Sequence, residues 1–111
     1  MIRVQCASLA YYRFESLADE RVIHGMFTRL GGSSQGPFAG LNVGHTVGDD
    51  PVNVAANHAA IYQVLGARAE AVVTARQVHG NRVAVVSAED GGKTFPETDA
   101  LISNVPGLFL L

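Results

Sequence analysis

The clearest pattern of apolar and polar positions in the chain predicts an α-helix over residues 51–65. Apolar positions recur there three or four residues apart, as they do on the buried face of a helix. Asp50 is suited to cap the N-terminus, Pro51 fits the first helical position, and Gly66 can end the helix in a left-handed conformation. The positions that define this face are Val54, His58, Ile61 and Leu65.

Short apolar runs on both sides of this helix predict β-strands. A Gly/Ser-rich loop over residues 30–40 separates two of them, and a loop with Gly, Lys and Pro over residues 89–98 separates two others. Several strands around one helix indicate an α+β fold. The predicted strands cover residues 10–14, 22–29, 41–48, 71–76, 82–87, 99–103 and 108–111.

Residues 77–80, Gln-Val-His-Gly, join two of these predicted strands. A histidine at such a join rests on a rigid frame and can direct a ring nitrogen at a metal or a substrate. Gly80 would let the backbone turn tightly beside His79. A histidine between two strands is more often a surface or capping residue, so the spacing alone leaves both interpretations open.

The other three histidines show no metal-binding spacing. No pair lies four residues apart on a helix, and no His-x-His pair occurs in a strand. His58 lies on the apolar face of the predicted helix and His24 in a predicted strand, so we expect structural roles for both. His45, in a glycine-rich segment, fits either a structural or a functional role.

Residues 29–34, Arg-Leu-Gly-Gly-Ser-Ser, combine a guanidinium with glycine-rich backbone. Such a combination can bind an anion such as phosphate. The segment has no Walker lysine and no GxGxxG motif, so a flexible turn with a surface arginine is the simpler interpretation. Asp49 and Asp50 could form a metal-binding pair, although helix capping explains Asp50. Asp99 is expected to end a turn.

Composition narrows the class of protein. The chain has 111 residues, of which 48% are hydrophobic and 16% charged, so it can form a core and is at most one domain. Its net charge of −2, with interspersed signs, gives no electrostatic argument for a nucleic-acid or membrane partner. The single Cys6 excludes an internal disulfide. Without an apolar signal or membrane span, we expect a cytoplasmic protein.

The last residues, 105–111, form an apolar run with no polar tail after it. An open apolar strand favours aggregation, and proteins rarely end in one. We therefore expect the chain to be the N-terminal portion of a longer protein.

Several short motifs follow one another in a fixed order from about residue 22 to residue 111. Each motif is weak alone, but the ordered set resembles the YfiH-like family of purine nucleoside phosphorylases, also known as laccase-domain or polyphenol oxidase proteins. These motifs lie at residues 24–34 (HGMFTRLGGSS), 36–37 (GP), 40–44 (GLNVG), 47–51 (VGDDP), 57 (N), 77–80 (QVHG) and 99–101 (DAL).

This resemblance implies one longer α+β domain with mixed β-sheets and flanking helices, of which residues 1–111 are the N-terminal part. It implies a zinc site formed by a histidine of a Gln-Val-His-Gly motif, a cysteine and a second histidine. Only the first matches this chain, as His79, and Cys6 lies outside the matching motifs. The resemblance also makes Arg29 a candidate for catalysis and for phosphate or substrate contact, with Gly31, Gly32 and Asn42 as further candidates for substrate or phosphate binding.

The activity that the resemblance implies is zinc-dependent phosphorolysis of adenosine, inosine and methylthioadenosine, together with deamination of adenosine. Purine nucleosides and phosphate are then the expected partners. Three protein ligands of mixed nitrogen and sulfur character suit zinc and leave one position open for water or substrate.

Two alternatives stay open beside this reading. One is a copper-dependent polyphenol oxidase of the same family, although the clustered histidines of multicopper sites do not occur in these residues. The other is an inactive fragment, since one expected zinc ligand of three is present and the isolated chain should show little activity. The sequence leaves the oligomeric state open.

Overall fold

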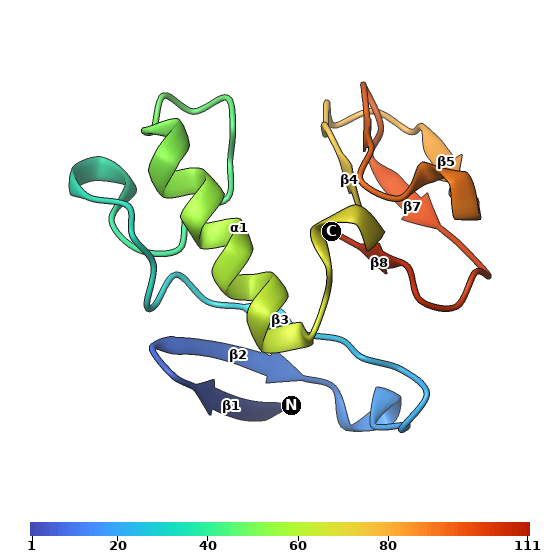
Figure 1. Cartoon of the computed structure of the whole chain (residues 1–111), viewed down its shortest axis with the longest axis horizontal. Helices are drawn as coiled ribbons and strands as arrows, with labels where there is room; N and C mark the ends of the chain where they lie inside the picture. The colour runs from blue at the N-terminus through green and yellow to red at the C-terminus, as the bar shows by residue number, and fades with distance from the viewer. The chain divides into compact units, whose positions relative to one another are not determined.

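The computed structural model describes residues 1–111 and has an α+β fold (Figure 1). The chain divides into two compact units, Met1–Gly66 and Ala67–Leu111, which are described separately below as unit 1 and unit 2. None of its helices has the length and apolar character that a bilayer crossing requires. The observed helix and strands confirm the α+β class expected from the sequence.

Unit 1 contains an antiparallel sheet of three strands in the order β1-β2-β3. Tyr11 on β2 pairs with Phe27 on β3, and their rings stack with centroids 4.9 Å apart. The predicted strand at 10–14 is thus confirmed, whereas β1 was not predicted. The strands are β1 (Ile2–Cys6), β2 (Leu9–Arg13) and β3 (Met26–Phe27), with a short 3-10 helix, η1 (Glu15–Leu17), after β2.

The prediction of a long strand over residues 22–29 is wrong except for the two residues of β3. The N–H of Val22 donates to the carbonyl of Asp19 in a turn. The N–H of Phe14 donates to Nε2 of His24 at 2.8 Å. A histidine side chain therefore takes the place that a strand carbonyl would occupy, and pairing starts only after Gly25.

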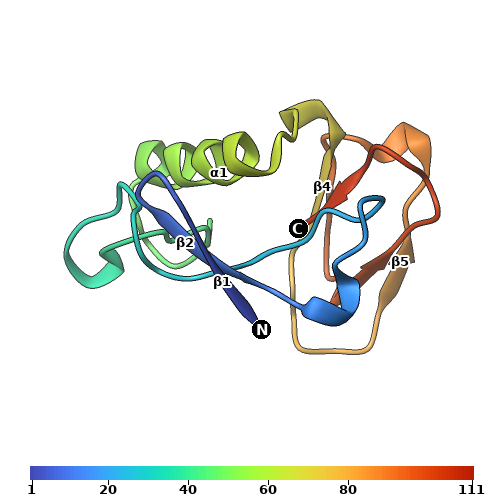
Figure 2. The same ribbon diagram turned by 90° about the horizontal axis from the view of Figure 1, so that it is seen from below.

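Helix α1 (Pro51–Leu65) has the predicted bounds and ends. The side chain of Asp50 accepts a hydrogen bond from the N–H of Val52 at 2.9 Å, and Gly66 is left-handed with φ 67°. The apolar face of α1 packs beside β2 in the core of unit 1 (Figure 2). This core is built on Leu9, Leu41 and Ile61, with Phe27 and Leu65 against it.

The predicted strand over residues 41–48 is wrong, because side chains replace the strand hydrogen bonds there. The N–H of Gly44 donates to the side-chain oxygen of Asn42 at 3.1 Å. The loop before it contains a second 3-10 helix, η2 (Gly36–Phe38), and a single antiparallel bridge between Ser34 and Gly40.

Unit 2 contains two small parallel sheets, in the orders β6-β4-β8 and β5-β7. Four of these strands lie inside the predicted ranges, while β6 falls in a predicted loop. β4 and β5 do not pair with each other, so residues 76–82 connect two sheets and do not form a hairpin. The elements are η3 (Ala69–Ala71), β4 (Val72–Ala75), β5 (Val83–Val85), η4 (Ala88–Asp90), β6 (Thr94–Phe95), β7 (Ala100–Ile102) and β8 (Phe109–Leu110).

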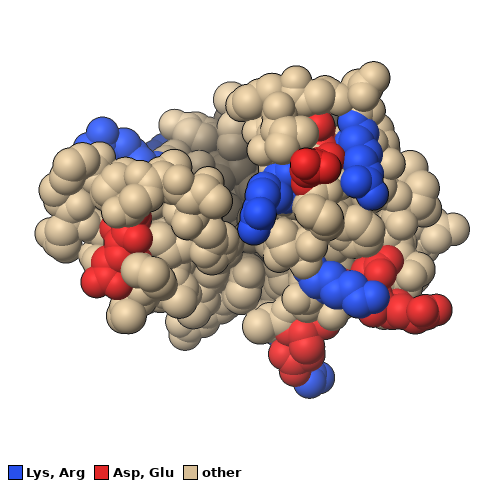
Figure 3. All heavy atoms as spheres, turned by 90° about the horizontal axis from the view of Figure 1, so that it is seen from above, with Lys and Arg blue, Asp and Glu red and all other residues tan.

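Acidic and basic side chains are interspersed on the face shown in Figure 3. Three ion pairs join neighbouring residues on the surface. Exposed pairs of this kind contribute little to stability. Charge therefore does not determine the fold of either unit, which depends on apolar packing and on the hydrogen bonds described next.

Candidate functional site

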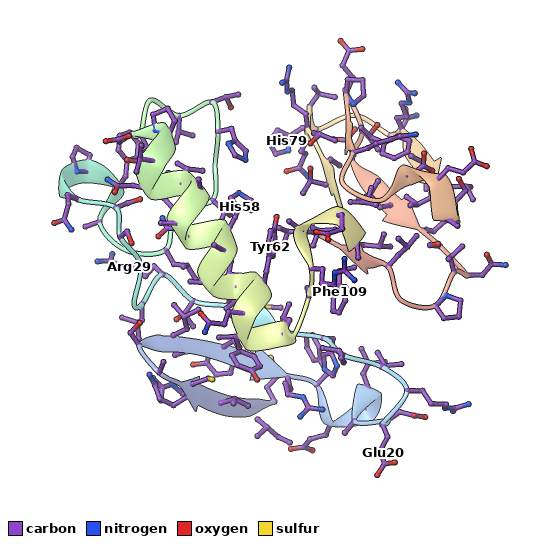
Figure 4. The ribbon with its side chains drawn as sticks, in the orientation of Figure 1. Glu20, Arg29, His58, Tyr62, His79 and Phe109 are labelled. Carbon is purple, nitrogen blue, oxygen red and sulfur yellow. The ribbon has the colours of Figure 1, made fainter.

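His79 lies in the loop that connects β4 to β5 in unit 2, and its side chain is exposed (Figure 4). Its backbone is left-handed, with φ 58°, which is uncommon for a residue other than glycine. The ring forms no hydrogen bond within unit 2. Both ring nitrogens are therefore available to an external group, as a metal ligand or a substrate contact requires.

Asp99, directly before β7, lies beneath this loop. One carboxylate oxygen, Oδ1, accepts a hydrogen bond from the N–H of Val78 at 3.1 Å. The other, Oδ2, is buried and receives no hydrogen bond of good geometry. Burial acts to raise the pKa of Asp99, but the backbone N–H groups of Val78, Gly80, His79 and Arg82 outweigh it, and the pKa lies below its usual value. The carboxylate is thus held in its charged form.

Arg29 belongs to unit 1 and projects from the start of the glycine-rich loop, exposed to solvent (Figure 4). Its carbonyl accepts a hydrogen bond from the N–H of Leu41 at 2.9 Å, which fixes the backbone. Its guanidinium forms no ion pair within unit 1 and is available to an anion.

The glycines of this loop have a structural explanation. A β-carbon on Gly31 would come within 1.9 Å of the carbonyl oxygen of Ser8, and one on Gly32 within 2.0 Å of the carbonyl oxygen of Gly40. Both contacts are with backbone, which cannot move aside easily. Close approach of chain segments therefore accounts for both glycines, and their N–H groups form no hydrogen bond to the protein.

The rest of the loop is fixed by Asn57, on the buried face of α1. Asn57 is 1% exposed, and its oxygen accepts from the N–H of Ser33 at 2.7 Å. Its amide nitrogen donates to the carbonyl of Asn42 at 2.7 Å and to the hydroxyl of Ser34 at 2.9 Å. The backbone N–H groups of Ser33 and Ser34 both have protein partners, so within residues 29–34 an anion would find free N–H groups at Gly31 and Gly32.

Asp49 completes this hydrogen-bond network. Its carboxylate accepts from the hydroxyl of Ser34 and from the side-chain amide of Asn42. Hydrogen bonds from Asn42 and Ser34 hold the pKa of Asp49 below its usual value. The oxygen of the Asn42 side chain is bonded to Gly44, so both ends of this side chain have protein partners.

His58 and Tyr62 project from the same side of α1 (Figure 4). Nε2 of His58 lies 2.9 Å from the carbonyl of Val43 and must donate to it, since a carbonyl only accepts. Nδ1 then accepts from the hydroxyl of Tyr62 at 3.3 Å. The ring of His45 stacks on that of His58 with centroids 4.9 Å apart. The structural role predicted for His58 is confirmed, as is that of His24, which accepts from Phe14.

No three or more His, Cys, Asp or Glu side chains of the chain are arranged to hold a metal ion. Proteins bind zinc through three or four ligands. His79 is exposed, its ring nitrogens form no hydrogen bond within unit 2, and the ends of its loop are fixed. It is therefore suited to supply one zinc ligand. The residues present therefore fit a single donor of such a site and do not make up the whole site.

Four of the predicted site residues lie in unit 1: Arg29, Gly31, Gly32 and Asn42. It places His79 in unit 2. Asn57 holds the glycine-rich loop and Asp99 accepts from the loop of His79. Both residues belong to the family motifs, but the sequence alone predicts neither of these contacts. The one available signal was a polar asparagine on the apolar face of a predicted helix.

Comparison with known proteins gives one family. The family described as multi-copper polyphenol oxidoreductase laccase matches residues 23–111. A purine nucleoside phosphorylase of Corynebacterium glutamicum is 42% identical over 84 residues, which are 75% of this chain and 34% of that protein. A purine nucleoside phosphorylase of Deinococcus radiodurans is 45% identical over 89 residues, covering 80% of this chain and 33% of that protein. The chain spans about a third of the length of these relatives.

Solved structures agree with this family. The crystal structure of YlmD from Geobacillus stearothermophilus matches with a TM-score of 0.85 and 32% identity over 98% of this chain and 43% of that one. A hypothetical protein YfiH of Bacillus licheniformis matches with a TM-score of 0.74 and 31% identity, covering 78% of this chain and 35% of that one.

Proposed function

Because this chain belongs to the multi-copper polyphenol oxidoreductase laccase family, whose curated relatives are named purine nucleoside phosphorylases, we propose that it is the N-terminal part of such a phosphorylase. In this proposal the protein cleaves adenosine, inosine or methylthioadenosine with phosphate, deaminates adenosine and depends on zinc. Its two units are parts of one domain, and it acts in the cytoplasm. The observation that carries the proposal is the name shared by relatives with 42–45% identity.

His79 is proposed as a zinc ligand. Its exposed ring has no partner in unit 2, and both ends of its loop are hydrogen-bonded to residues 95–99. When bound, zinc supplies a Lewis acid and one open coordination position. The protein's part in this is to present one imidazole nitrogen from a fixed backbone, which limits the geometry that the bound ion can adopt.

Arg29 is proposed to bind phosphate or the nucleoside, next to Gly31, Gly32 and Asn42. A guanidinium binds phosphate through two parallel hydrogen bonds, and a fixed cation lowers the cost of bringing an anion to the sugar. Gly31 and Gly32 offer N–H groups without protein partners. Asn42 is engaged on both sides, so its contribution is to hold the loop that presents Arg29.

The test uses a chimera in which these 111 residues replace the matching segment of YlmD from Geobacillus stearothermophilus. His79→Asn is the informative variant, because asparagine tolerates the left-handed backbone while removing the imidazole. We expect phosphorolysis of inosine to fall by roughly 100-fold, since even residues that only support metal ligands typically cost 10–100-fold. Activity equal to that of the parent chimera would remove His79 from the mechanism.

A second candidate function is copper-dependent oxidation of phenols, which the description of the matching family favours. Metal analysis of the freshly purified chimera separates the two candidates. Zinc at close to one ion per protein, with phosphorolysis of inosine, supports the phosphorylase. Copper in stoichiometric amount, with oxidation of a phenol such as catechol, supports the oxidase.

A further inference from the structure

Residues 77–81 depend on very few contacts. Both ends of this loop are tied to the segment that precedes β7. On one side the N–H of Arg76 donates to Phe95 and its carbonyl accepts from Thr98; on the other the carbonyl of Arg82 accepts from Asp99. Between these ends the structure contains one hydrogen bond within unit 2, from the N–H of Val78 to Asp99.

The carboxylate of Asp99 is itself held in place. Thr98, the preceding residue, is fully buried, and its hydroxyl donates to the carbonyl of Pro96 at 2.8 Å. The N–H of Asp99 donates to Arg82 at 2.9 Å, and β7 begins at the next residue. A carboxylate on such a backbone can act as a fixed hydrogen-bond acceptor for a loop that has no regular secondary structure.

The loop also fits closely over this carboxylate. A β-carbon on Gly80 would lie 3.2 Å from Oδ2 of Asp99, which is tighter than most such contacts. Glycine therefore lets the backbone come close to Oδ2, a buried oxygen without a hydrogen-bond partner. His79 stands between Val78, which is bonded to one oxygen, and Gly80, which lies against the other, and it is the residue with the unusual φ of 58°.

We propose that Asp99 is a positioning residue for His79: its carboxylate holds residues 78–80 in the backbone conformation that directs the imidazole outward. The catalytic meaning of this inference rests on the proposed function, because orientation matters to turnover only if the imidazole binds the metal or the substrate. Whether Asp99 fixes the loop can be tested on the 111-residue chain without any assay of activity.

Amide hydrogen exchange followed by NMR tests whether Asp99 fixes this loop. We expect Asp99→Ala to accelerate exchange at Val78 by about tenfold relative to Val73 in the core of the same unit, because the charge-assisted hydrogen bond of the Val78 N–H is lost. Asp99→Asn keeps one acceptor oxygen, so its effect should be intermediate. Unchanged exchange at Val78 in Asp99→Ala would overturn the inference.

Asp90→Ala is the matched control. Asp90 is a second carboxylate of unit 2 that accepts from a backbone N–H, that of Ser87, at 2.8 Å. Its removal should accelerate exchange near Ser87 and leave Val78 and His79 as in the parent chain. Faster exchange at Val78 in this control, equal to that in Asp99→Ala, would show general loosening and overturn the specific role of Asp99.

The chimera then tests whether Asp99 affects turnover. We expect Asp99→Ala to lower kcat for inosine phosphorolysis by about tenfold with little change in KM, and Asp99→Asn to restore part of it. An active Asp99→Ala beside an inactive His79→Asn would overturn this inference alone. If His79→Asn is active as well, the proposed role of His79 fails, while the exchange results still decide whether Asp99 fixes the loop.

Discussion

His58 shows how one ring can be fixed entirely by its surroundings. It donates to Val43 through one nitrogen, accepts from Tyr62 through the other and stacks on His45. Burial lowers the pKa of His58; the hydrogen bond to Val43 opposes this shift, and the nearby charge of His45 adds to it. The neutral ring with hydrogen on Nε2 is the form that satisfies both contacts.

This pKa predicts that unit 1 loses stability in mild acid. The pKa of His58 is lower in the folded chain than its ordinary value of about 6.5, so the unfolded chain binds the proton more readily. Stability due to this residue is complete above about pH 6.5 and declines as the pH falls toward the folded pKa. Thermal unfolding followed by circular dichroism should therefore give a lower Tm at pH 5 than at pH 7.5.

His58→Gln provides the comparison for this prediction, because glutamine has no proton to gain in this range. The variant should be less stable than the parent at pH 7.5, since the two hydrogen bonds are altered, but its Tm should change less between the two pH values. The same pH dependence in both proteins would show that another group is responsible.

At the scale of elements, the glycine-rich loop and helix α1 form one structure through Asn57. Its side chain satisfies the N–H of Ser33 and two oxygens of the loop from a site that water does not reach. Buried polar groups of this kind must all be paired, because an unpaired one is costly. The loop next to Arg29 is therefore bonded directly to the helix at Ser33 and Ser34.

Asn57→Ala is expected to destabilise the chain by about 2–4 kcal/mol, since it leaves several buried polar groups without partners. Asn53→Ala, one turn earlier on the same helix, is the matched control, because Asn53 forms no side-chain hydrogen bond. Its cost should stay within about 0.5 kcal/mol. Urea unfolding of the two variants measures both values, and equal losses would contradict the role given to Asn57.

How well the sequence predicted each element depended on where its hydrogen bonds lie. Helix α1 was predicted to the residue, because its cap, first proline and terminal glycine are local signals. Residues 22–25 and 41–48 were predicted as strands because they are apolar. In the structure the side chain of His24 accepts from the backbone N–H of Phe14, and the side chain of Asn42 accepts from the backbone N–H of Gly44. Such long-range or side-chain bonds leave no periodic trace in the sequence.

Long-range hydrogen bonds also explain which residues of the candidate site the sequence could predict. His79 and Arg29 were singled out from their residue types and, above all, from the resemblance to a family. Asp99 was expected only to end a turn, because nothing in the sequence shows that a residue 21 positions away donates to it. The predicted roles of His79, Arg29, Gly31, Gly32 and Asn42 in binding remain predictions.

At the scale of the whole molecule, the chain holds a third of the length of its relatives and one of the proposed zinc ligands. We therefore expect the 111 residues alone to bind zinc far more weakly than the chimera does and to show little phosphorolysis of inosine, because a single imidazole cannot hold the ion. Isothermal titration with zinc and an assay with inosine and phosphate measure the two quantities. Rapid turnover by the 111-residue chain would contradict this expectation.

The contacts of Asn57 also have a consequence for the order of folding. They join residues 15 to 24 positions apart, so a peptide that covers only the helix would form none of them. The chain between Ser33 and Asn57 must close on itself before this amide becomes buried, and closing this segment costs conformational entropy that a single helical turn does not. Refolding kinetics of Asn57→Ala should accordingly report the step at which this segment of the backbone closes.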